Sequence, residues 1–132
     1  MGRVIHFEIQ ADNIDRATKF YEQALGWKID QMMTKEKGGM DYWGITTGPE
    51  GTPGINGGMY KRDEASEKFY LYDCTAEVEN LDKAIDAVKA AGGTIVREKS
   101  EIPGVGWFAG VKDTEGNRLG LMQPTEWKAK GL

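Results

Sequence analysis

Apolar and polar residues alternate along residues 4 to 10, which predicts a strand with one buried face. Ile5, Phe7 and Ile9 fall on the apolar face, and His6 and Glu8 fall on the opposite, polar face. The pattern then changes to helical spacing, with apolar residues every three or four positions up to a glycine at position 26. An asparagine or aspartate before this segment offers an N-cap, so we expect a strand followed by an amphipathic helix.

The rest of the sequence predicts further strands and one more helix, and both halves of the chain have the same order of elements. After the first helix we expect three strands, over residues 27–34, 40–47 and 55–61. Charged residues at 62–68 read as an exposed connector. The second half predicts a strand at 69–76, a helix at 80–91 closed by Gly92 and Gly93, and strands at 94–99, 106–112 and 118–123.

Sliding the chain on itself by 67 positions tests whether the halves are copies. Asn13 then falls on Asn80, Asp15 on Asp82 and Gly26 on Gly93, so the start and stop of the two helices coincide. We therefore predict an α+β fold within a single domain, 1–132, built from two βαβββ modules at 3–61 and 69–123. The strands of both modules are expected to form a curved mixed sheet whose polar faces line a concave site, with the helices on the outer face.

Composition narrows the class of protein. With 17 basic and 21 acidic residues the net charge is −4, and the basic residues are scattered, which argues against nucleic acid as a partner. A single cysteine excludes an intramolecular disulfide. Apolar stretches are short and the chain enters a strand almost at once, so we expect no membrane span, no leader and a cytoplasmic protein.

Three segments together resemble the glyoxalase/bleomycin-resistance/dioxygenase superfamily, also called the vicinal oxygen chelate superfamily. They are the first strand, the helix ending in Phe-Tyr-x-x-x-Leu-Gly-Trp at Trp27, and the Asp-x-x-Gly-Asn turn at Asp113 before the last strand. Residues 102–108 are similar to a lactoylglutathione-lyase-related branch. The resemblance implies the fold described above, a small-molecule ligand and a homodimer.

The resemblance also implies four places for the ligands of a divalent metal, on the first and last strand of each half. Here these places hold His6, Asp73, Gly120 and Gly58, with Gly57 in place of Gly58 if the strand slips by one residue. Two donors are too few to hold zinc, nickel or iron firmly. We therefore expect no tightly bound metal, although Glu8 could add a third donor to His6 and Asp73 and keeps a metal possible.

The candidate catalytic residues are His6, Glu8 and Asp73. His6 is the only histidine and could line a pocket, transfer a proton or have only a structural role. Asp73 could pair with His6 as an acid/base couple, or could be a solvated or backbone-bonded carboxylate.

The candidate ligand-binding residues combine polar groups, aromatic rings and glycines: Trp43, Asn56, Gly58, Tyr60, Trp107, Phe108, Arg118, Gly120 and Met122. The two tryptophans and Phe108 could stack on a planar compound, although core packing explains them equally well. The glycines at the metal-ligand places are expected to leave empty volume that admits a bulkier ligand.

Two functions of different classes follow. The first is a metal-independent binding protein of the bleomycin-resistance type, which holds a small aromatic or planar molecule. The second is a lyase related to lactoylglutathione lyase, which uses His6, Glu8 and Asp73 with a weakly held divalent ion to act on vicinal oxygens. An accessory role, with glycine-rich loops docking on another protein, remains a third reading.

Overall fold

The computed structural model describes residues 2–37, 39–62 and 72–126, which fall into two compact units. The N-terminal unit runs from His6 to Tyr72. The C-terminal unit begins at Asp73 and also includes the residues up to Ile5. Each unit is described by itself below.

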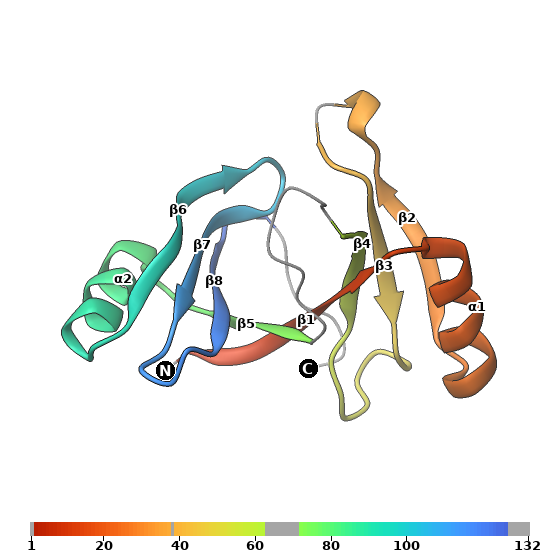
Figure 1. Ribbon diagram of the computed structural model, residues 1–132, viewed down its shortest axis with the longest axis horizontal. Coiled ribbons are helices and arrows are strands. Elements are labelled where there is room, and N and C mark those ends of the chain that lie inside the picture. The colour runs from red at the N-terminus through yellow and green to blue at the C-terminus, as the bar shows by residue number, and fades with distance from the viewer. Residues whose placement is uncertain (1, 38, 63–71, 127–132) are drawn as a thin grey trace. The chain divides into compact units, whose positions relative to one another are not determined.

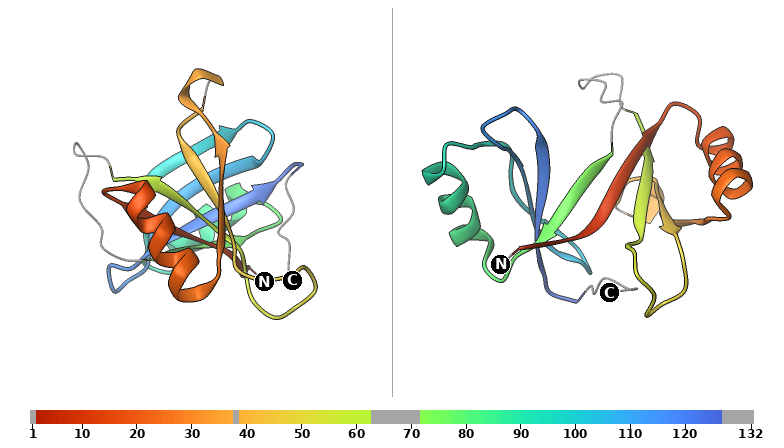
Figure 2. Two further views of the ribbon diagram at one scale, coloured as in Figure 1. Left: turned by 90° about the vertical axis from the view of Figure 1, so that its right-hand side faces the viewer. Right: turned by 90° about the horizontal axis from the view of Figure 1, so that it is seen from below.

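The N-terminal unit packs one helix on a mixed four-stranded sheet. Its elements are β1 (Arg3–Ala11), α1 (Ile14–Leu25), β2 (Lys28–Met33), the short 3-10 helix η1 (Lys35–Lys37), β3 (Tyr42–Thr46) and β4 (Gly57–Lys61). The strands lie in the order β2-β3-β4-β1, with β1 parallel to β4 and the other neighbours antiparallel. Figure 2 shows α1 lying along one face of this sheet.

The C-terminal unit repeats that plan. Its elements are β5 (Asp73–Glu77), α2 (Leu81–Ala90), β6 (Thr94–Ile102), β7 (Gly106–Lys112) and β8 (Arg118–Pro124), shown in green to blue in Figure 1. The strands lie in the order β5-β8-β7-β6, and β5 and β8 are parallel. The predicted α+β class with two βαβββ modules is thus confirmed. Whether both modules form one domain around a shared concave site stays a prediction.

The helix ends form as the sequence predicts. Asn13 Oδ1 accepts a hydrogen bond from the backbone N–H of Arg16, and Asn80 Oδ1 accepts one from Lys83, each at 3.0 Å. Gly26 ends α1 in the left-handed region with φ of 71°. In the second helix the glycine with positive φ is Gly92 rather than Gly93, and the C-cap is Ala91, so the helix ends two positions earlier than the repeat predicts.

Each unit has its own hydrophobic core, made by the apolar strand face and the inner side of the helix. Met59 at the centre of the first core and Leu81 in the second are fully buried. Trp43 packs against the first core and Trp107 against the second. For both tryptophans the structure therefore supports the core-packing interpretation.

The repeat extends to the hydrogen-bonding register of the sheets. On the parallel pair of the N-terminal unit Glu8 lies opposite Gly58, and on the parallel pair of the C-terminal unit Thr75 lies opposite Gly120. Thr75 is also the residue that the 67-position shift aligns with Glu8. Several strand boundaries differ from the predicted ones by a few residues: β3 and β4 are shorter than predicted, and β6 continues to Ile102. Residues 63–71, which include most of the predicted connector and the predicted start of the strand at 69–76, lie outside the described residues.

Candidate functional site

The polar face of the N-terminal sheet carries the predicted catalytic histidine. His6 and Glu8 alternate along β1 with the core residue Phe7 and therefore point away from the core. Gly58 shares their face because it is the register partner of Glu8. Gly57 belongs to the core side, where an added Cβ would lie 2.7 Å from the Phe7 ring. Of the two positions considered from the sequence, Gly58 is thus the one beside His6 and Glu8.

His6 is held by a tyrosine that the sequence analysis did not single out. Its Nε2 atom lies 2.8 Å from the hydroxyl oxygen of Tyr42, at the start of β3. Burial lowers the pKa of His6 from 6.5 to about 4, although the Glu8 carboxylate 3.9 Å away favours the charged form. Burial and the charge of Glu8 raise the pKa of Tyr42. Near neutral pH the hydrogen bond therefore joins an uncharged phenol to an uncharged imidazole, and either can be the donor.

The Tyr42 side chain also occupies the space beside Gly58. A Cβ added at Gly58 would overlap the hydroxyl and ring of Tyr42. The expectation that this glycine leaves empty volume is therefore wrong. Tyr42 stands two residues before Gly44, the register partner of Gly58, so all three share one face. The contact follows from this register, which the sequence alone does not give.

Two further polar side chains extend this face along β1 and β4. Gln10 follows Glu8 by two residues, and its amide nitrogen donates to the hydroxyl of Tyr60 at 2.9 Å. Tyr60 was predicted to bind ligand, and it stands on the same face two residues after Gly58. The face thus offers phenol, amide, imidazole and carboxylate groups from adjacent strands.

The equivalent face of the C-terminal sheet has the same construction with different chemistry. A Cβ added at Gly120 would lie 2.8 Å from the ring of Phe108 and 2.8 Å from Thr75 Oγ1, so the expected empty volume is absent here too. The guanidinium carbon of Arg97 lies 5.3 Å from the centre of the Phe108 ring. Met122, the register partner of Phe108, is 6% exposed and forms part of the packed face.

Asp73 occupies the first position of β5, on the face of Thr75 and Gly120. Burial raises the pKa of its carboxyl, and the positive charge of Arg118 opposes that rise. Its Oδ1 atom is buried and has no hydrogen-bond partner among the described residues. Because His6 and Asp73 belong to different units, their predicted acid/base pairing stays a prediction.

Asn56 takes part in a local structural contact. It immediately precedes β4, and its Oδ1 accepts hydrogen bonds from the backbone N–H of Thr47 at 3.0 Å and from the Thr47 hydroxyl at 3.3 Å. These bonds tie together the two ends of the β3–β4 connection. A role for Asn56 in ligand binding stays a prediction.

The donors on the polar face of the N-terminal unit do not by themselves fit a firmly held divalent metal. His6 and Glu8 supply one nitrogen and one carboxylate in the N-terminal unit, Gly58 supplies nothing, and Nε2 of His6 is already bonded to Tyr42. Nowhere in residues 2–37, 39–62 and 72–126 do three or more His, Cys, Asp or Glu side chains gather so that they could hold a metal ion.

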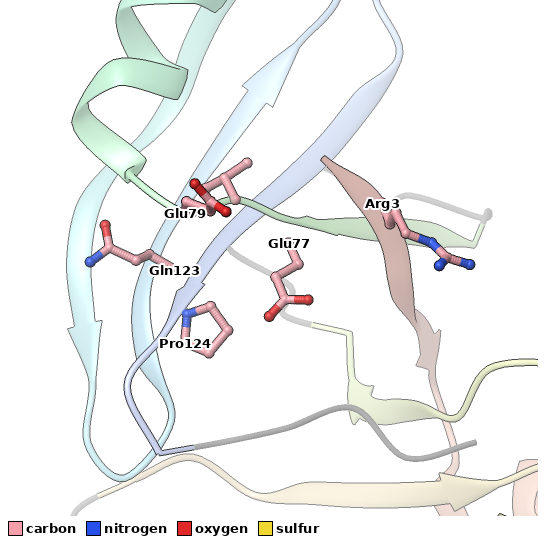
Figure 3. Close-up of a pocket in the computed structure, with 6 residues that line it drawn as sticks. Arg3, Glu77, Glu79, Gln123 and Pro124 are labelled. Atoms are coloured by element: carbon pink, nitrogen blue, oxygen red, sulfur yellow. The ribbon is translucent and has the colours of Figure 1, made fainter. Parts of the chain in front are cut away.

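Two hollows lie away from His6 and Asp73. One, of about 470 Å³, is lined by Arg3, Glu77, Val78, Glu79, Gln123 and Pro124 (Figure 3). The other, of about 400 Å³, lies between β1 and α1 in the N-terminal unit. Neither is lined by His6 or Asp73, and in the first hollow the amide oxygen of Gln123 is engaged by the backbone N–H of Leu81. We favour the polar strand faces as the candidate site because the buried titratable groups lie there.

No helix in the described residues has the length and apolar character needed to cross a lipid bilayer.

Comparisons with known proteins agree with this architecture. A protein named "Probable lactoylglutathione lyase" from Vibrio parahaemolyticus is 26% identical over 130 residues, covering 92% of this chain and 91% of that protein. A hypothetical protein from Bacillus halodurans aligns with a TM-score of 0.72 at 16% identity, over 96% of this chain and 97% of its own. Methylmalonyl-CoA epimerase from Mycobacterium tuberculosis aligns with a TM-score of 0.65 at 16% identity, over 92% and 87%.

At 16% identity, the two structural alignments show that the fold is shared, and they carry no information about activity. The family model of the Glyoxalase/Bleomycin resistance protein/Dioxygenase superfamily matches residues 3–121, which is most of both modules. The protein belongs to this superfamily.

Proposed function

We propose that this protein binds a small organic molecule on its polar strand faces without a tightly held catalytic metal. The observation that carries the proposal is that an aromatic ring fills the space beside each of the two glycines at the expected ligand places. Tyr42 lies over Gly58 in the N-terminal unit, and Phe108 lies over Gly120 in the C-terminal unit. Aromatic rings beside a few polar groups suit a flat organic ligand better than a cation that needs three or four donors.

Two measurements test this proposal. Protein purified without added metal and without chelator is examined by elemental analysis, and the expected content is far below one metal ion per chain. The same protein is titrated with a panel of planar aromatic compounds, and saturable changes in tryptophan fluorescence are expected. Stoichiometric zinc, nickel or iron would overturn the metal-free proposal, and a panel that gives no saturable change would overturn aromatic binding.

A second candidate is a metal-dependent lyase related to lactoylglutathione lyase. It is favoured by the relative from Vibrio parahaemolyticus and by the common face of His6 and Glu8. Turnover of a 2-oxoaldehyde–glutathione adduct in the presence of Ni²⁺ or Zn²⁺ would support it, and His6→Ala should then abolish that turnover. Turnover that persists in His6→Ala would remove His6 from the mechanism.

The resemblance also implies a homodimer, and we include this assembly in the proposal. Light scattering on the purified protein is expected to give twice the 14.6 kDa mass of the chain. A mass equal to one chain at micromolar concentration would contradict it.

A further inference from the structure

We propose that Tyr42 is a specificity-determining residue of the N-terminal polar face, where its ring excludes a side chain at position 58 and its hydroxyl engages His6 in place of a metal ion. This inference rests on the proposed function. It goes further by naming the residue that makes the face a site for an uncharged, hydrogen-bonding ligand group.

The first argument is the use of space. Glu8 and Gly58 are register partners, and His6 stands two residues before Glu8 on the same face. A carboxylate at position 58 would therefore join His6 and Glu8 as a third donor. The Tyr42 side chain lies where even the first atom of such a side chain would go.

The second argument comes from the internal repeat, which separates the role of the ring from that of the hydroxyl. Phe108 precedes Gly110 by two residues, as Tyr42 precedes Gly44, and both aromatic rings cover the glycine on the last strand of their unit. The C-terminal unit achieves this packing with a phenyl ring. The hydroxyl is found in the unit whose first strand carries a histidine, and it bonds that histidine at 2.8 Å.

The third argument concerns His6 itself. Its Nε2 atom is 2.8 Å from Tyr42 and 3.9 Å from the nearer carboxylate oxygen of Glu8, so of these two neighbours only Tyr42 is within hydrogen-bonding distance. A cation would have to displace the phenol to reach this nitrogen. An uncharged ligand group can instead join a hydrogen-bonded pair that is already formed.

The main test uses the gain of a metal site. Wild type, Tyr42→Ala, Gly58→Glu and the double variant are titrated with Co²⁺ in a calorimeter, and the visible absorption of bound Co²⁺ is recorded. The double variant should bind Co²⁺ at least about tenfold more tightly than any of the other three, because only there is the third donor present and the space open. Equal affinity for wild type and double variant, or for Gly58→Glu alone and the double variant, would overturn the inference.

A second measurement does not depend on the folding of the double variant. His6 is the only histidine, so its two ring nitrogens give one pair of ¹⁵N signals. Tyr42→Phe should shift the Nε2 signal and weaken binding of aromatic compounds that carry a hydroxyl or carbonyl group. The matched control is Tyr21→Phe, which removes a phenol bonded to Tyr72 instead and should leave both readouts unchanged.

The results distinguish this inference from the proposed function. Unchanged His6 signals in Tyr42→Phe would overturn the role of Tyr42 while leaving metal-free binding intact. A stoichiometric metal in wild-type protein would overturn the proposed function directly.

Discussion

Burial of His6 lowers its pKa in the folded protein, so protonation of this side chain favours the unfolded state. The unfolded chain takes up a proton on this side chain as the pH falls below 6.5, whereas the folded chain resists until the pH reaches about 4. The unfolded state thus binds more protons in this window, so stability is fully present above pH 6.5 and falls as the pH is lowered toward 4. The expected loss from this residue is about 3 kcal/mol.

Urea unfolding followed across this pH window measures that loss. Carboxylates also begin to titrate near pH 4, so the contribution of His6 is the difference between wild type and His6→Gln. The variant should lose clearly less stability than wild type between pH 6.5 and 4. Parallel pH profiles for the two proteins would show that the histidine does not carry the predicted effect.

Gly120 makes a second prediction at the level of one residue. Its backbone is free of positive φ, so the obstacle to a side chain is contact with Phe108 and Thr75, each 2.8 Å from an added Cβ. Gly120→Ala should lower the free energy of unfolding by about 1–3 kcal/mol through overpacking. Gly39→Ala is a suitable control, because its nearest neighbour would lie at 3.7 Å. If Phe108 is the obstacle, Phe108→Leu should remove most of the loss in the double variant.

At the scale of elements, the two helices depend on matched N-caps. Asn13 and Asn80 each accept a hydrogen bond from the backbone N–H three residues later. Replacing either asparagine by alanine should lower the free energy of unfolding by about 1 kcal/mol, and replacement by aspartate should have little effect. Chemical denaturation of the four variants tests this, and an alanine variant as stable as its aspartate counterpart would argue against the cap.

These local signals explain why the elements could be predicted from the sequence. A helix cap, a glycine with positive φ and an alternating strand each depend on residues that lie near each other in the chain. The hydrogen bond between His6 and Tyr42 depends instead on the register of three strands and was missed. The expectation of empty volume at Gly58 and Gly120 was wrong for a related reason. The missing side chain leaves space only if no neighbouring strand fills it, and here an aromatic ring from the adjacent strand does so.

At the scale of the whole molecule, two separate cores predict two separable effects on stability. Met59 and Leu81 are both fully buried, one in each unit. Met59→Ala and Leu81→Ala should each lower the free energy of unfolding by about 2–5 kcal/mol because each leaves a cavity. Hydrogen exchange should then accelerate more in β1–β4 for the first variant and more in β5–β8 for the second. Equal acceleration throughout the chain for both variants would mean that the units open as one.

The parallel pairing of β1 with β4 has a consequence for how the chain is made. β1 is synthesised first, yet its neighbour in the sheet is the last strand of the unit, ending at Lys61. The first residues, up to Ile5, group with a unit whose other members begin only at Asp73. During synthesis β1 is therefore complete well before β4, the strand that pairs with it in parallel, and its backbone hydrogen bonds to β4 form only after that delay.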